Sequence, residues 1–160
     1  MSQATVPPIQ SSNVFRLNVV QLCCLFSRAG PPGYKLTILL VDDDPLQAFV
    51  RKSILERRFS DVLRVAGAAE ALGMVEQPHF AHSLGLVVSG HHLAGIGGPA
   101  FVAELHTRMP SLPVLVLGDS NEVYGDYSVE GVRFLPRPVA AEEMLTAAGQ
   151  MLAQSSQKTA

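Results

Sequence analysis

Short apolar runs alternate with amphipathic segments along the chain from residue 36 onward. An apolar run bounded by turn-forming residues is typical of a strand that is buried on both faces of a sheet. The pattern predicts five strands, at Leu36–Val41, Val62–Ala66, Leu84–Ser89, Pro113–Leu117 and Val132–Leu135. Strands separated by helices predict a doubly wound α/β domain in which both sides of a five-stranded parallel sheet are covered.

Helical patterns occupy the segments between these strands. Asp44 is predicted to cap the first helix, and Pro45 to occupy its first position. This helix is amphipathic, with Leu46, Phe49, Val50 and Ile54 on one stripe and Gln47, Arg51, Lys52 and Arg58 on the other side. Further helices are predicted at Ala68–Glu76, which Pro78 ends, and at Ala100–Met109, Asn121–Tyr127 and Ala140–Ala153.

The composition is that of one globular domain with some additional chain. The 160 residues are 48% hydrophobic and 16% charged, which is enough apolar material for one core. The net charge of -2 gives no electrostatic reason to expect binding to nucleic acid or to an anionic membrane. Cys23 and Cys24 are adjacent, and neighbouring cysteines rarely pair with each other. A reducing compartment, the cytoplasm, is therefore expected.

The first 35 residues are predicted to be an extension outside the domain. Their apolar segment, Val14–Phe26, is too short to span a membrane and is interrupted by polar residues. A Gly-Pro-Pro-Gly break at Gly30–Gly33 separates this extension from the first strand. We expect residues 1–35 to be disordered or loosely helical, residues 36–153 to form the domain, and residues 154–160 to be a polar tail with no output module after it.

Charged and glycine residues collect where the predicted strands end. They are Asp42 and Asp43 after the first strand, Gly90 after the third, Gly118 after the fourth and Arg137 after the fifth. The carboxyl ends of parallel strands meet at one edge of a sheet, and the functional site of such open sheets lies beyond that edge. Adjacent carboxylates repel each other, so this pair is typical of a site for a cation or for phosphate transfer.

Four segments carry a family resemblance: LLVDDDP at Leu39–Pro45, LAGIGG at Leu93–Gly98, PVLVL at Pro113–Leu117 and FLPRPV at Phe134–Val139. In their order and spacing they resemble the receiver domain of bacterial response regulators, over Leu36–Leu152. The resemblance implies the flavodoxin-like (βα)5 receiver fold with strand order 2-1-3-4-5. It also implies a role in the phosphorelay signal transduction of two-component systems.

The resemblance assigns a role to each residue at the sheet edge. Receivers hold Mg²⁺ with acids after the first strand, and these fall on Asp42 and Asp43. The family's phosphoacceptor aspartate falls on Gly90, its Thr or Ser on Gly118, and its Lys on Arg137. Glycine has no side chain to phosphorylate, so the resemblance implies a degenerate receiver, or pseudo-receiver, that lacks the phosphoacceptor.

Two pairs of residues near this edge allow more than one interpretation. Asp42 and Asp43 could bind Mg²⁺ weakly, but neutralisation by Arg137 is favoured, because a guanidinium can fork to carboxylates. His91 and His92 could contribute to a transition-metal site. Exposed loop histidines are favoured instead, since a zinc site needs three or four converging ligands.

Three further side chains bear on the site. Phe134 falls on the family's aromatic switch position, and without a phosphate to respond to it is expected to pack or to form an interface. Asp119 could return a carboxylate to the pocket, although a turn or helix cap is favoured. Ser89 could replace Gly90 as acceptor only through a one-residue slip, which would turn the buried side chains of the strand to its other face.

Three hypotheses for the function remain open. The leading one is a single-domain, phosphorylation-independent response-regulator-like protein, not an enzyme and without a cofactor beyond weak Mg²⁺. Its expected partner is a histidine kinase, another regulator or a second copy, docked on the fourth helix, fifth strand and fifth helix. The second is a working phosphoreceiver with a displaced acceptor such as Asp119 or His91. The third is a flavodoxin-like ligand-binding domain with a large apolar pocket at the strand ends.

Overall fold

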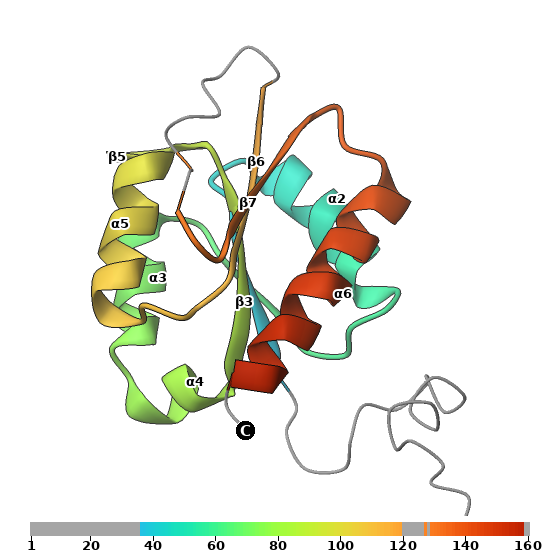
Figure 1. Ribbon diagram of the computed structural model, residues 1–160. Coiled ribbons are helices and arrows are strands. Elements are labelled where there is room, and N and C mark those ends of the chain that lie inside the picture. Colours follow the sequence, from blue (N-terminus) through green and yellow to red (C-terminus); the bar gives the residue numbers. More distant parts are fainter. Residues whose placement is uncertain (1–35, 120–126, 128, 159–160) are drawn as a thin grey trace, which may run out of the picture. The chain divides into compact units, whose positions relative to one another are not determined.

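A five-stranded parallel sheet forms the centre of the domain in the computed structural model, which describes residues 36–119, 127 and 129–158 (Figure 1). The strands are β1 (Thr37–Val41), β2 (Val62–Val65), β3 (Leu84–Gly90), β6 (Val114–Asp119) and β7 (Val132–Arg137). Their order is β2-β1-β3-β6-β7, and each neighbouring pair is parallel. The predicted strand order 2-1-3-4-5 is therefore confirmed.

Helices cover both faces of this sheet. One face carries α2 (Pro45–Glu56) and α6 (Ala141–Lys158), and the other carries α3 (Ala68–Val75), α4 (Pro78–Ser83) and α5 (Gly98–Arg108) (Figure 1). Side chains alternate along β1, so Ile38 and Leu40 join the core beneath α2 and α6, while Leu39 and Val41 join the core on the opposite face. A strand that is buried on both faces has no polar side, which explains the unbroken apolar run.

Some elements differ from the expectation. Pro78 begins α4 instead of ending the preceding helix, because the first helical position does not use the hydrogen bond that proline lacks. A short antiparallel hairpin, β4 (His92–Leu93) with β5 (Ile96–Gly97), follows β3. α6 continues to Lys158, so the prediction of a tail from residue 154 is wrong for residues 154–158. Those residues include no helix breaker, so the helix can continue through them.

Two predictions concern parts of the chain that the structure does not describe. They are the extension at residues 1–35 and the helix predicted at Asn121–Tyr127, of which Tyr127 alone is described. Within the described ranges, no helix is both long enough and apolar enough to cross a lipid bilayer.

Asp44 and Pro45 begin α2 as predicted. The Asp44 Oδ1 atom accepts hydrogen bonds from the backbone N–H groups of Leu46 and Gln47, at 2.9 and 3.1 Å. These amides have no partner inside the helix, so the carboxylate stabilises its first turn. Of the three consecutive acids, Asp44 therefore has a structural role.

The buried face of α2 differs from the amphipathic stripe in the sequence. Leu46, Phe49 and Val50 are 72%, 70% and 48% exposed, whereas Ala48 and Leu55 are fully buried. The apolar stripe therefore faces solvent along most of its length. The helix turns its polar side toward the sheet edge instead, because an arginine on that side pairs with a buried carboxylate there, as described below.

Candidate functional site

The sheet register brings the predicted site residues to one edge. Val41 lies beside Ser89 in the β1–β3 pair, so Asp42, one residue later, lies beside Gly90. Gly90 in turn pairs with Leu117 on β6. These strand ends border a pocket of about 160 Å³. The residues that line the pocket include Asp42, Asp43, Arg51, Gly90, His92 and Arg137.

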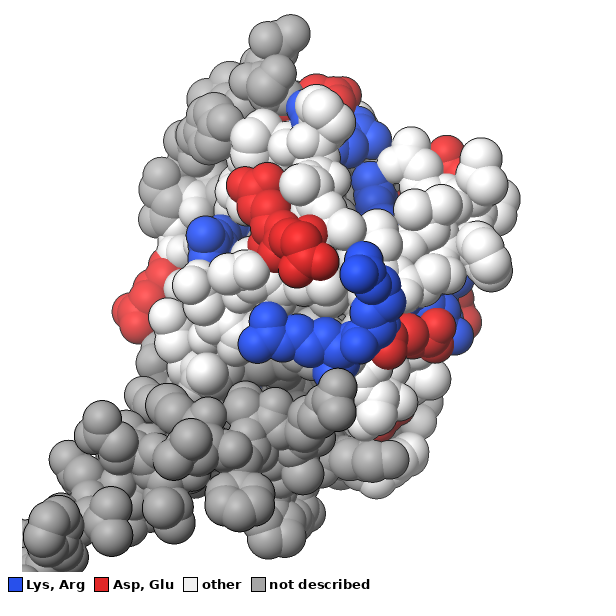
Figure 2. Space-filling view, turned by 90° about the vertical axis from the view of Figure 1, so that its right-hand side faces the viewer, with Lys and Arg blue, Asp and Glu red and all other residues white. Residues whose placement is uncertain are grey.

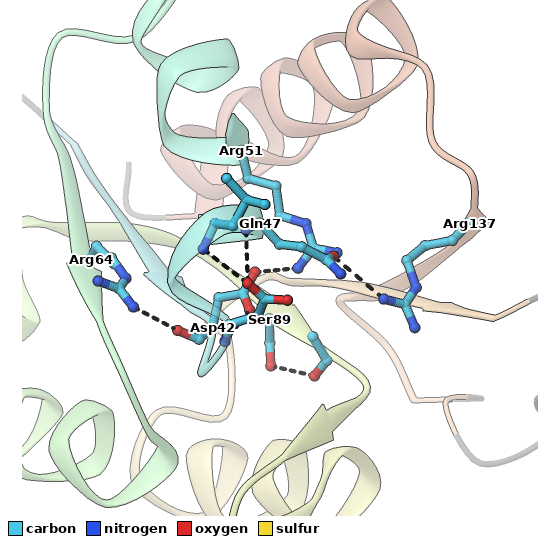
Figure 3. A network of polar contacts seen from close by, with 9 residues as sticks. Asp42, Gln47, Arg51, Arg64, Ser89 and Arg137 are labelled. Carbon is cyan, nitrogen blue, oxygen red and sulfur yellow. Dashed lines mark hydrogen bonds and ion pairs between the residues drawn. The ribbon is translucent and has the colours of Figure 1, made fainter. Parts of the chain in front are cut away.

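Asp42 is 4% exposed and is held from several sides. Its Oδ2 pairs with Arg51 Nη1, its Oδ1 accepts a hydrogen bond from the Asp44 N–H at 3.1 Å, and its carbonyl oxygen accepts one from Arg64 Nη2 at 3.4 Å. The Arg51 side chain, 12% exposed, also donates from Nη2 to Gln47 Oε1 at 2.6 Å (Figure 3). Because arginine keeps its proton in proteins, Arg51 supplies a permanent positive charge to the buried carboxylate.

Arg137 does not make the contact that the sequence predicted. Its Nη2 pairs with Asp119 Oδ2 at 3.0 Å, and its Nη1 lies 3.5 Å from Gln47 Oε1. The reason is the register, which sets Asp119 directly opposite Arg137 in the β6–β7 pair. Two strands separate β1 from β7, so at about 4.8 Å per strand spacing the backbones that carry Asp42 and Arg137 lie roughly 14 Å apart across the sheet. The prediction that Arg137 neutralises Asp42 or Asp43 is therefore wrong, and Arg51 takes that role for Asp42.

Asp43 is exposed, and its Oδ2 accepts a hydrogen bond from the Ala94 N–H at 3.2 Å. No group of three His, Cys, Asp or Glu side chains within the described ranges is arranged to hold a metal ion. Mg²⁺ requires near-octahedral oxygen ligation, whereas here Asp42 is already paired with a guanidinium. The donor set therefore does not fit Mg²⁺.

The two glycines that the resemblance assigns to reactive positions lie at neighbouring strand ends. A Cβ atom on Gly90 would approach nothing nearer than the His92 carbonyl oxygen, at 3.4 Å, so the site retains room for a side chain. Gly118 is buried and pairs with Pro136. Ser89 is 1% exposed, donates its hydroxyl to the Gly90 carbonyl oxygen at 2.8 Å and does not line the pocket.

A row of aromatic rings crosses the edge from β3 to β7, and the sequence did not reveal it. The ring of His91 contacts that of Tyr127, with centroids 5.6 Å apart, and Tyr127 stacks on Phe134 at 5.7 Å. His91 Nδ1 and Tyr127 Oη lie 2.5 Å apart. His91 is therefore half-buried, contrary to the expectation of an exposed loop residue, while His92 is exposed as expected. Phe134 is half-buried and packed, as expected.

A second hollow lies next to the pocket, between α2 and the start of α6. Its volume is about 640 Å³, and Asp119 borders it but not the pocket that holds Asp42 and Asp43. This groove is named the α2–α6 groove below. Arg137 borders both hollows, and Gln47 lies between the two arginine heads. Asp119 therefore serves as the partner of Arg137 and does not return a carboxylate to the pocket.

The sheet order, the helices on both faces and the acids at the end of β1 define a flavodoxin-like domain of the receiver type. Residues 38–149 match the family model of the response regulator receiver domain. The chain therefore belongs to the response regulator receiver family.

Solved receiver structures share this fold. The chain is similar to a response regulator receiver domain protein from Clostridium thermocellum, at 20% identity over 76% of this chain and 98% of that chain, with a TM-score of 0.69. The signal receiver domain of an HD domain-containing protein from Pseudomonas fluorescens Pf-5 matches at 24% identity over 77% and 98%, with a TM-score of 0.68. The receiver domain of the hybrid histidine kinase CckA matches at 27% identity over 72% and 98%, with a TM-score of 0.60. No curated protein matches the chain.

Proposed function

We propose that this receiver domain works without phosphorylation and acts through protein–protein contact. The observation that carries the proposal is the buried ion pair between Asp42 and Arg51, at the place where the family resemblance puts a divalent cation. Arg51 gives the carboxylate the positive charge that a metal ion would give it. The guanidinium belongs to the chain itself, so this neutralisation does not depend on a bound ligand.

The missing nucleophile supports the same conclusion. In this proposal Gly90 stands where the phosphoacceptor aspartate of receivers falls, and no side chain of the described residues replaces it. Asp119 is paired with Arg137, and Ser89 is not among the residues that line the pocket. A domain with neither an acceptor nor a metal site retains only its surface for signalling. A histidine kinase, another regulator or a second copy is therefore the class of partner to expect.

The direct test is incubation of the purified full chain with acetyl phosphate and Mg²⁺, followed by intact-mass measurement. The expected result is an unchanged mass. A single phosphoryl adduct of about 80 Da on the folded protein would overturn the proposal. Peptide mapping of such an adduct would then show whether a displaced acceptor, Asp119 or His91, carries it, as the second hypothesis predicts.

A further inference from the structure

One apolar stripe on the described surface is not covered by any other described element. Five large apolar side chains are strongly exposed in the described ranges, and three of them, Leu46, Phe49 and Val50, lie on one side of α2. At spacings of three and four residues they form a continuous stripe. The stripe exposes roughly 300–400 Å² of apolar surface, which is the size at which a patch on a monomer commonly marks an interaction site.

The α2–α6 groove runs beside this stripe. Leu46 and Val50 line one wall of the groove, and Val139, just before α6, and Met144, in its first turn, line the other. Phe49 does not line the groove but protrudes next to it, with 70% of its surface exposed. The groove volume of about 640 Å³ is ample for a phenyl ring. Each molecule therefore carries a protruding aromatic ring and an apolar groove side by side.

We propose that two copies of this chain associate through α2, with Phe49 of each copy seated in the α2–α6 groove of the other. A two-fold dimer uses the same patch on both copies, so a ring and a groove that lie side by side can satisfy each other in both directions. This inference deepens the proposed function by naming a second copy as the partner. It does not require the absence of phosphorylation.

The charges along α2 favour an antiparallel pairing of the two helices, in which the two-fold axis runs perpendicular to α2. Asp43 and Asp44, both exposed, precede the helix. Arg57 follows it, and its side chain is 60% exposed although it pairs with Glu142 at 3.7 Å. Val50 lies seven residues from both Asp43 and Arg57. With two copies of α2 crossing near Val50, the acidic end of each therefore lies against the basic end of the other.

The charges on the surface around α2 and α6 also allow two copies to approach each other. Figure 2 views the side of the molecule that carries α2 and α6, and its Lys and Arg side chains lie close to Asp and Glu side chains. Among the described residues seen in this view, no large area carries a single sign, so these parts of two copies meet without strong like-charge repulsion. Lys52 and Glu56 form one such pair on α2 itself, at 3.5 Å.

The available area sets the strength of the dimer. Specific interfaces bury at least about 1,000 Å² in total. Two stripes supply much of this area, and the walls of the two grooves supply the remainder, which places the interface near the lower limit. The expected dimer is reversible, with a Kd of about 10–100 µM.

Sedimentation velocity on the full chain from about 1 to 300 µM tests the proposal, with a reductant present so that Cys23 and Cys24 do not link copies. The mass is expected to rise from the monomer value of 17.1 kDa toward twice that value. Phe49→Glu should raise the Kd at least tenfold. Leu63→Glu is the matched control and should leave the Kd unchanged. Leu63 lies on the edge strand β2, beside Leu39, on the sheet face opposite to α2. A monomer at every concentration, a dimer that survives Phe49→Glu, or equal loss in Leu63→Glu overturns the proposal.

A charge exchange tests the antiparallel arrangement separately. Arg57→Asp should weaken the dimer about threefold or more, and Asp43→Arg combined with Arg57→Asp should restore it. If the double variant is no tighter than Arg57→Asp, the two ends do not meet and the proposed geometry is overturned. The acetyl phosphate experiment reports on the acceptor alone, so failure of the dimer and failure of the proposed function are distinguishable.

Discussion

Tyr127 Oη lies where a side chain at position 98 would begin. A Cβ atom on Gly98 would come within 2.2 Å of this hydroxyl and within 2.6 Å of the His91 carbonyl oxygen. Gly98 begins α5, and its N–H donates to that same carbonyl at 2.8 Å. The close approach of the helix start to the end of β3 and to the aromatic row therefore requires glycine at this position.

Gly98→Ala is expected to destabilise the domain by about 3 kcal/mol or more, because backbone has to move to relieve the contact. Gly97→Ala, one residue earlier, is the matched control. A Cβ atom there meets nothing within 4 Å, and the φ of -70° is open to any residue. Gly97→Ala should therefore be within about 0.5 kcal/mol of the parent. Urea unfolding followed by circular dichroism measures both variants, and equal effects would contradict the packing described here.

Arg51→Met is expected to destabilise the domain by about 3–5 kcal/mol, because it leaves the Asp42 carboxylate buried without a counter-charge. Lys52→Met is the neighbouring control. The Lys52–Glu56 pair spans 3.5 Å with both side chains well exposed, so this change should cost no more than about 0.5 kcal/mol. Adding Asp42→Asn to Arg51→Met should recover part of the loss, since no unpaired charge then stays buried. A double variant that is less stable than Arg51→Met would show that the ion pair does not act in this way.

Gly90→Asp together with Arg51→Ala is expected to create a Mg²⁺ site. The Cβ atom at position 90 has room, and removal of Arg51 frees Asp42 to act as a ligand. For a millimolar site, 10 mM Mg²⁺ should stabilise the double variant by about 1.4 kcal/mol, which is a rise in Tm of roughly 3–5 °C. The parent should shift by less than about 1 °C. Thermal unfolding with and without Mg²⁺ makes the comparison, and an equal shift in both proteins would argue against Arg51 as the residue that excludes the metal.

Asp44→Ala is expected to cost about 1 kcal/mol through loss of the two hydrogen bonds to the first turn of α2. Asp44→Asn keeps a capping oxygen, so this variant should lose only a few tenths of a kcal/mol of stability. Equilibrium unfolding in urea separates the two variants. Equal losses of stability in Asp44→Ala and Asp44→Asn would mean that the charge of Asp44, and not its capping hydrogen bonds, is the origin of the effect.

The elements with the strongest local signals could be read from the sequence. The five apolar runs became the five strands, and Asp44 and Pro45 began α2. Each of these signals depends on residues a few positions apart, whose relation is fixed by strand or helix geometry. The hairpin β4–β5 and the extension of α6 to Lys158 carry weak local signals, and the sequence pattern missed both.

The sequence by itself determined the order of strands and helices, the collection of charges at the carboxyl edge, and glycine at the third strand end. Tertiary structure alone decided which arginine meets Asp42, which face of α2 is buried, and that Tyr127 joins His91 to Phe134. The physical reason lies in the sheet order. It places β7 three positions from β1 and sets Asp119 opposite Arg137, so the charge nearest to Asp42 comes from the helix that follows it. Spacing along the chain contains no information about distances across a sheet, and those distances selected the ion pairs.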